Sequence, residues 1–259
     1  MKEEILARLD RIETEEAVKI LYACESGSRA WGFPSADSDY DVRFLYLHPR
    51  DWYLSVDLER RRDVIERPIV DEIDLNGWDL RKALLLFWKS NPPLLEWLDS
   101  PIVYRENGRT AGRIRRLAKT YYSPKACMYH YLHMAKGNYR EYLKGERVWV
   151  KKYFYVLRPV LAIRWLENDL GVVPMKFQEL VEKTVESPEL KREINRLIVE
   201  KERGAELDDG PRNPVIGDFL DSEMRRLTAK QFQLPTGHRS MEELNALFRG
   251  ALEEAWGGK

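Results

Sequence analysis

The sequence predicts an α/β (α+β) fold, in which a small mixed sheet with helices is followed by a helical domain. Short apolar or alternating runs, typical of strands, occur before about residue 110, and long amphipathic stretches follow. The chain has 259 residues, of which 44% are hydrophobic, so it can bury a sizeable core. We therefore expect two domains, residues 1–110 and residues 111–259.

The first elements follow from the spacing of apolar residues. Residues 3–12 carry them at helical intervals, and residues 18–24 form a short apolar run that predicts a buried strand. Residues 25–29 then predict a loop. Turn and breaker residues lie between Gly32 and Ser38, and the alternating run 40–47 predicts a second strand.

A further strand is expected over residues 65–75, ended by Asn76-Gly77. Asp79 can cap a helix over residues 80–89, which cannot continue through the two prolines that follow. Residues 94–98 predict a short apolar helix or turn.

The second half of the chain is expected to be helical, because strand patterns fade and amphipathic stretches take over. The predicted helices cover residues 112–119, 124–143, 148–168, 175–184, 187–203, 217–231 and 240–255.

Composition narrows the classes of function. Lys plus Arg and Asp plus Glu number 43 each, so the chain as a whole has no field that attracts nucleic acid, and a polyanion would need a local patch. Cys24 and Cys127 are too few for a disulfide framework, which favours a reducing cytoplasm. The charged start predicts no secretory signal. The longest apolar stretch, residues 83–88, is far short of the roughly 20 residues of a membrane helix, so no membrane partner is expected.

The stretch from Ser26 to Asp41 contains the residues most indicative of chemistry. Residues two apart in a strand point the same way, so Asp39 and Asp41 are expected to present two carboxylates on one face, roughly 7 Å apart at the backbone. Carboxylates are ligands for hard cations, and a pair of Mg²⁺ ions suits in-line attack on a nucleotide phosphate.

A glycine-serine pair precedes these carboxylates. Gly27 lets the backbone approach a triphosphate closely, and Ser28 offers a hydroxyl to its oxygens. Arg29 either adds positive charge or faces solvent. Each piece alone is common in ordinary turns, whereas the joint arrangement of apolar strand, Gly-Ser, Asp-x-Asp and second strand is much rarer.

In the helical half, Lys151, Tyr155 and Arg158 fall at i, i+4 and i+7. This spacing places two cations and an aromatic ring on one helix face, where the ring could stack on a base. The alternative is an ordinary solvated face with extended lysine side chains.

These motifs resemble the nucleotidyltransferase superfamily of DNA polymerase beta, whose signature is a Gly-Ser loop, an Asp-x-Asp and a later acidic residue on a neighbouring strand. Further motifs resemble the group of predicted nucleotidyltransferases typified by bacterial YcgL-type proteins, which includes proposed RNA-repair enzymes. The motifs that carry this likeness are Gly-Ser-Arg-Ala-Trp-Gly-Phe (27–33), Ser-Asp-Tyr-Asp-Val-Arg (38–43), Trp-Asp-Leu-Arg-Lys (78–82), Asn-Pro-Pro-Leu-Leu-Glu-Trp-Leu (91–98) and Lys-Lys-Tyr-Phe-Tyr-Val-Leu-Arg-Pro (151–159).

The resemblance implies a nucleotidyltransferase core with two Mg²⁺ ions, or Mn²⁺ in their place, held by Asp39, Asp41 and a third carboxylate. Asp71, Glu72 and Asp74 are the candidates for the third ligand; we choose Asp74, with Glu72 second, since both share a face under regular alternation. The resemblance also implies that a helix-borne lysine and tyrosine, here Lys151 and Tyr155, bind the incoming nucleotide.

The expected reaction moves a nucleoside monophosphate from an NTP, such as ATP, to a hydroxyl acceptor and releases pyrophosphate. An RNA 3′ hydroxyl is the first choice of acceptor, because RNA repair is the proposed role of the group. A protein hydroxyl and a small-molecule alcohol are alternatives that use the same core. A nucleotide-binding regulatory module without catalysis is the hypothesis from a different class.

Overall fold

The computed structural model describes residues 1–204, 207–230 and 240–257. The chain divides into two compact units, and these are described separately. The first comprises residues 1–30, 39–122 and 237–259, and the second comprises residues 31–38 and 123–236. The division expected from the sequence, at residue 110, differs from this one in three places. Residues 31–38 group with the helical unit, whereas residues 111–122 and the last helix group with the sheet.

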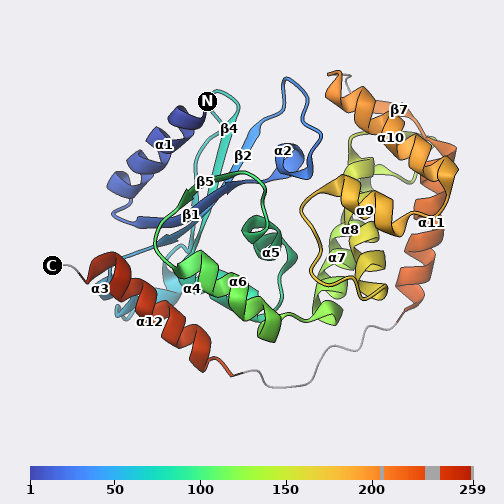
Figure 1. Cartoon of the computed structure of the whole chain (residues 1–259). Coiled ribbons are helices and arrows are strands. Elements are labelled where there is room, and N and C mark those ends of the chain that lie inside the picture. The colour runs from blue at the N-terminus through green and yellow to red at the C-terminus, as the bar shows by residue number, and fades with distance from the viewer. Residues whose placement is uncertain (205–206, 231–239, 258–259) are drawn as a thin grey trace. The chain divides into compact units, whose positions relative to one another are not determined.

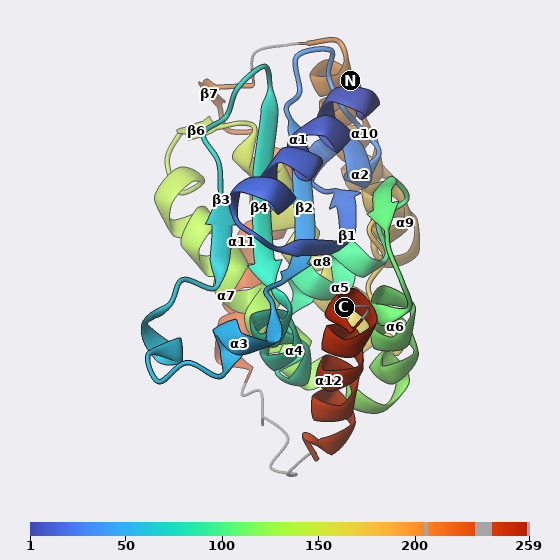
Figure 2. The ribbon, with the colours of Figure 1, turned by 90° about the vertical axis from the view of Figure 1, so that its left-hand side faces the viewer.

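The first unit contains a mixed five-stranded sheet, so the predicted fold class is confirmed. The strands lie in the order β3-β4-β2-β1-β5, and only β2 and β4 run parallel (Figure 2). Their bounds are β1 (Lys19–Glu25), β2 (Tyr40–Leu47), β3 (Val64–Glu66), β4 (Ile73–Asp79) and β5 (Val103–Glu106).

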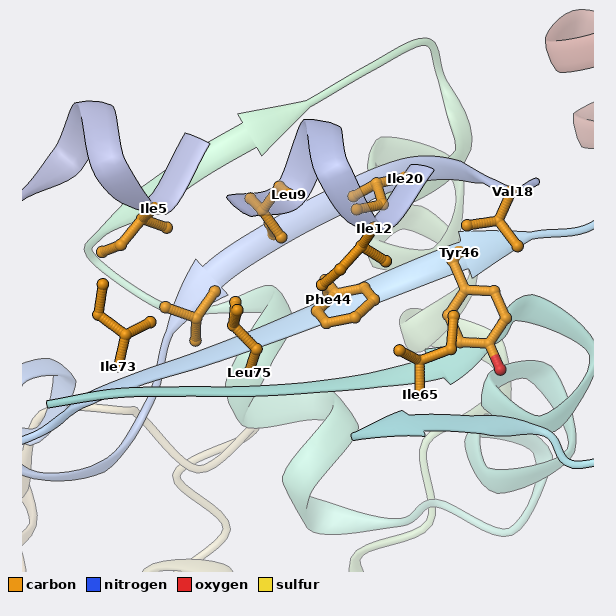
Figure 3. Packing of buried hydrophobic residues seen from close by; sticks show 12 residues of the cluster. Ile5, Leu9, Ile12, Val18, Ile20, Phe44, Tyr46, Ile65, Ile73 and Leu75 are labelled. Atoms are coloured by element: carbon orange, nitrogen blue, oxygen red, sulfur yellow. The ribbon is translucent and has the colours of Figure 1, made fainter. Parts of the chain in front are cut away.

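Helix α1 (Lys2–Glu15) covers one face of this sheet. Its Ile5, Leu9 and Ile12 are buried against Phe44 and Leu75 and their neighbours on the strands (Figure 3). The apolar spacing predicted this helix. Each such side chain contributes about 1.5–3 kcal/mol when it is fully buried, so the cluster holds the sheet and α1 together.

The other face is covered by helices that follow β4 and β5 in the chain (Figure 1). Asp79 caps the first of them as predicted, because its side chain accepts a hydrogen bond from the amide of Arg81 at 2.8 Å. The helices of this unit after α1 are α3 (Arg50–Tyr53), α4 (Leu80–Trp88), α5 (Pro92–Leu98), α6 (Thr110–Tyr121) and α12 (Glu242–Trp256), with a 3₁₀ turn at Leu58–Arg60.

The single strand predicted over residues 65–75 is wrong, because the chain forms a hairpin there. Asp71 and Glu72 both adopt positive φ, 52° and 61°, and reverse the chain between β3 and β4. The predicted stop at Asn76-Gly77 is also wrong. Gly77 lies inside β4, where a Cβ atom would stand 2.1 Å from the ring of Phe44. The glycine therefore serves the packing of that ring.

The second unit is mainly helical, as predicted. Helices α7 and α8 lie side by side (Figure 1). A pair of short antiparallel strands at Arg147–Trp149 (β6) and Asp209–Pro211 (β7) was not predicted, and it delays the start of α8. The helices are α7 (Pro124–Tyr142), α8 (Lys152–Glu167), α9 (Phe177–Thr184), α10 (Pro188–Glu202) and α11 (Pro214–Ala229). No helix in the described ranges has both the length and the apolar character needed to span a bilayer.

Residues 31–38 pack within this helical unit. The ring of Phe33 stacks on Phe154 at 4.6 Å between centroids and meets Phe177 edge-on at 5.4 Å. The buried Lys201 donates hydrogen bonds to the hydroxyls of Ser35 and Ser38 at 3.4 and 3.3 Å. The segment between the Gly-Ser turn and Asp39 is thus fixed by helices encoded more than a hundred residues later.

Candidate functional site

Two of the predicted carboxylates stand side by side on the sheet. Asp41 of β2 and Asp74 of β4 are register partners on the two parallel strands. Val42 and Leu75, next to them in sequence, are buried in the cluster under α1. Because side chains alternate along a strand, Asp41 and Asp74 point to the opposite face. Their side chains are 29% and 27% exposed, so a ligand can reach them.

Arg43 joins these carboxylates. Its Nη2 donates to Asp41 Oδ1 at 3.0 Å and to Asp74 Oδ2 at 2.8 Å, and its Nη1 donates to the carbonyl of Asp74 at 3.2 Å. A guanidinium therefore places positive charge between the two acidic side chains. The sequence analysis did not single out Arg43, although its position two residues after Asp41 on a strand puts it on the same face.

Gly27 lies directly against Asp41. Its φ is +57°, and a Cβ atom at this position would stand 1.9 Å from Asp41 Oδ2. The neighbouring amide of Ser26 donates to the carbonyl of Asp41 at 2.8 Å. The predicted loop at residues 25–29 is in part a short helix, α2 (Gly27–Trp31), which starts at this glycine. The structure thus brings the Gly-Ser turn and Asp41 together.

Glu25 is a site residue that the sequence analysis missed. It is fully buried, and its Oε1 accepts a hydrogen bond from the amide of Asp41 at 2.7 Å. The hydroxyl of Tyr104 donates to its other oxygen. Burial raises the pKa of Glu25 to about 7, although these hydrogen bonds favour the ionised form. A glutamate at the end of an apolar strand was the available signal, because such a side chain needs partners when buried.

Asp39 lies one residue before β2 and is exposed. Its carbonyl accepts a hydrogen bond from Arg29 Nε at 3.2 Å, and the guanidinium of Arg29 lies 3.8 Å from the centre of the Tyr40 ring. Arg29 therefore contacts Asp39, just before β2, and Tyr40, the first residue of β2. Asp39 and Asp41 are not two positions of one regular strand, as the sequence analysis expected.

Of the three candidates for a third carboxylate, only Asp74 stands beside Asp41. Asp71 and Glu72 form the hairpin turn and are exposed, and Asp71 pairs with Arg8 at 2.6 Å. The role of Asp74 as a metal ligand stays a prediction, and the regular strand on which the choice of Asp74 was based does not exist.

The three predicted nucleotide contacts of the helical unit have different surroundings. Lys151 is exposed, and Tyr155 is 40% exposed with its ring 5.7 Å from that of Trp31. Arg158 is only 3% exposed, and it donates to the carbonyls of Met175 and Pro174 at 2.9 and 3.1 Å. Arg158 thus supports the fold of this unit and does not share an exposed face with Lys151. A role of Lys151 and Tyr155 in nucleotide binding stays a prediction.

The donor set of Asp41 and Asp74 fits a divalent cation. Both are carboxylates, the ligand type that Mg²⁺ and Mn²⁺ prefer, and a positively charged group already lies between them. Within the described residues, however, no three acidic, histidine or cysteine side chains are gathered closely enough to enclose an ion. A metal would have to share or replace the contacts of Arg43.

Comparison with known proteins identifies the class of protein to which the chain belongs. A family model described as the RNA repair pathway DNA polymerase beta family (RlaP) matches residues 1–250. The class is therefore nucleotidyltransferase-like, with a DNA polymerase beta type of core. The chain belongs to the RNA repair pathway DNA polymerase beta family, and the resemblance seen in its motifs is confirmed.

Two individual proteins are similar to the chain. The uncharacterized protein YcgL of Bacillus subtilis (strain 168) is 50% identical over 257 residues, which cover 99% of this chain and 98% of the relative. A crystal structure of a nucleotidyltransferase-like protein from Exiguobacterium sibiricum 255-15 aligns over 97% of this chain and 90% of its own, at 12% identity. Its TM-score of 0.30 is too low to support an argument about the site.

Proposed function

We propose that the protein is a metal-dependent nucleotidyltransferase that moves a nucleoside monophosphate from an NTP to a hydroxyl group. The observation that carries the proposal is the pair of carboxylates on neighbouring parallel strands, Asp41 and Asp74, of which Asp41 lies against Gly27. Membership in a DNA polymerase beta-like family supports it.

The residues have separate roles in this proposal. Asp41 and Asp74, joined by Asp39, would hold Mg²⁺ or Mn²⁺, which supplies activation of the acceptor oxygen and neutralises charge on the leaving pyrophosphate. Gly27 and Ser28 would receive the phosphates, because the absence of a side chain at Gly27 lets a ligand come close to the backbone. Glu25 positions Asp41 through the amide hydrogen bond.

The first choice of acceptor is an RNA 3′ hydroxyl, supported by the RNA-repair description of the family. Modification of a protein or of a small molecule requires the same core and differs only in the acceptor. The acceptor is therefore identified by a direct transfer experiment.

A second candidate is a nucleotide-binding module that transfers nothing. Arg43 favours it, because its guanidinium forms ion pairs with both carboxylates without a metal and offsets one of their two negative charges. In that case the protein would bind an NTP equally well with and without a divalent cation.

Incubation with each α-labelled NTP, Mg²⁺ and total RNA distinguishes these functions. Labelled RNA supports end modification, labelled protein supports nucleotidylation of a protein, and label in a small product supports the third acceptor class. Absence of transfer with every acceptor, despite NTP binding, would favour the module without catalysis.

Two variants test the site itself. Asp41→Asn and Asp74→Asn should each lower transfer by on the order of a thousandfold or more, since each removes a negative charge that would hold the metal ion, and the metal stabilises charge on the phosphoryl group. Asp71→Asn is the matched control, because it removes a carboxylate three residues from Asp74 in the exposed turn. Unchanged transfer by Asp74→Asn would remove that residue from the metal site.

A further inference from the structure

A groove in the helical unit is lined by positively charged side chains that have no role in the reaction proposed for the site on the sheet. It lies between α7 and α11 and has a volume of about 840 Å³. Four cationic side chains line it: Lys136, Arg140, Lys144 and Arg225. Its single acidic residue, Asp221, is already engaged by Arg212 at 2.9 Å and by the hydroxyl of Tyr139 at 2.6 Å.

These four cations differ from four arginines of the unit that pair with carboxylates. None of the four forms an ion pair with a carboxylate in the described ranges. The paired arginines are Arg147 with Asp209, Arg196 with Glu193 and Glu200, Arg212 with Asp218 and Asp221, and Arg226 with Glu167 and Glu223. Because the whole chain has no net charge, this groove is a local concentration of unneutralised positive charge.

The arrangement favours a polymer over a single anion. Lys136 and Arg140 are one helical turn apart on α7, about 6 Å along its axis, and Lys144 follows just after the helix. Several cations spread along one groove suit a ligand that carries several negative charges. The ring of Tyr139 and the imidazole of His133 line the same groove, and aromatic rings among cations suit single-stranded nucleic acid, whose bases can stack on them.

We propose that this groove binds the phosphodiester backbone of a single-stranded RNA acceptor. The assignment to RNA rests on the proposed function, whereas the recognition of a polyanion rests on the groove alone. The four cations contact phosphates and carry no sequence preference, so binding is sensitive to salt and tolerant of sequence.

The test is the affinity of the full chain for a fluorescently labelled, single-stranded oligoribonucleotide, measured by anisotropy at several salt concentrations with EDTA and without NTP. With four phosphate contacts, the slope of log K against log salt should be about −3. The double variant Lys136→Glu/Arg140→Glu should bind on the order of tenfold more weakly or worse, with a slope shallower by about 1.4.

The matched control is Lys176→Glu/Lys183→Glu, which makes the same change of charge on exposed positions at the two ends of α9. It should bind as the unaltered protein does. Equal weakening by the two double variants, or by neither, would overturn the groove as the binding site. Displacement of the RNA by polyglutamate as readily as by unlabelled RNA of equal charge would overturn the nucleic acid assignment in favour of an acidic protein partner. Matching thermal melts establish that the variants are folded.

The experiments distinguish a failure of the groove as an RNA-binding site from a failure of the proposed transferase function. Asp41→Asn should keep full RNA affinity, because that residue is no part of the groove. Loss of RNA binding in the groove variant, in a protein that shows no transfer, would uphold the groove and remove the transferase. If the protein transfers nucleotide to RNA and the groove variant binds RNA as well as the unaltered protein does, the transferase is upheld and the groove is not the binding site.

Discussion

Glycine is required at position 27 for two independent reasons. Its φ of +57° lies in the left-handed region, and the carboxylate of Asp41 occupies the place of its missing side chain. Gly32 shares only the first reason, because its φ is +101° but nothing lies within 4 Å of a Cβ atom there. A comparison of substitutions at the two glycines therefore separates the effect of backbone strain from the effect of displacing the Asp41 carboxylate.

Gly27→Ala should lose transfer activity by on the order of a hundredfold or more, because Asp41 must turn away from the added methyl group and a shift of about 1 Å can cost that much. Gly32→Ala should keep most of the activity while it loses on the order of 1–2 kcal/mol of stability. Initial rates of NTP transfer and thermal melts of both variants provide the measurement. Equal losses of activity would show that strain alone is responsible.

Part of the site was predictable at this scale. Gly27 and Asp41 followed from motifs that are local in sequence, whereas Asp74 was chosen from the alternation of a strand that the structure replaces with a hairpin. The contacts of Arg43 and Glu25 did not follow from such motifs, because Arg43 reaches Asp74 on the neighbouring strand β4 and Glu25 meets Tyr104 on β5, the edge strand next to β1. Partners that are distant in sequence are set by strand pairing, which periodicity does not specify.

Elements with a sustained pattern were the ones predicted well. Helix α1 and strand β2 repeat their apolar residues over several turns or pairs, whereas β6 and β7 are three residues each and leave no detectable period. The hairpin between β3 and β4 was missed because its turn consists of Asp71 and Glu72. Asn-Gly or Asp-Gly is the usual signal of such a turn, and glutamate seldom adopts positive φ.

The stability of the protein should depend on pH through Asp79, the residue that caps α4. Asp79 is buried, and burial raises its pKa to about 6 from an ordinary value of 3.8, although it accepts hydrogen bonds from Arg81 and Tyr53. The folded state therefore holds the proton more tightly than the unfolded state does. The stability from this residue is fully present below about pH 4 and is lost as the pH rises through about 6.

As the pH rises from about 4 to above about 6, the unfolding free energy of the protein should fall relative to that of the Asp79→Asn variant, by at most about 3 kcal/mol. Asparagine keeps the capping oxygen but does not titrate. Urea denaturation of both proteins from pH 4 to pH 7 measures the difference. Parallel pH profiles would mean that Asp79 titrates normally in the folded protein.

At the scale of the whole molecule, the two units interleave along the chain. The chain leaves the sheet unit after Ala30, passes through the helical unit over residues 31–38, and returns at Asp39. The chain leaves the sheet unit a second time after Tyr122 and returns to it with α12, which contacts α4 and α6. The sequence-based boundary at residue 110 could not show this, because an excursion of eight residues carries no change in composition.

The excursion should contribute to the stability of the helical unit. Phe33→Ala removes a ring that is 2% exposed and packed on Phe154 and Phe177, which should cost about 3–5 kcal/mol. Phe33→Leu keeps most of the apolar volume and should cost less. Hydrogen exchange should show earlier opening of α8 and α9 in the alanine variant. Unaltered protection of these helices would contradict this role of Phe33.

This interleaving also limits how such a protein can evolve. A single crossover in the gene cannot transplant either unit intact. A break between Phe33 and Phe154 would separate these stacked rings, and a break between α4 and α12 would separate those two helices. Shuffling events that exchange modules elsewhere in nature would here yield a chain with an exposed apolar seam. We therefore expect the whole stretch to be inherited as one piece.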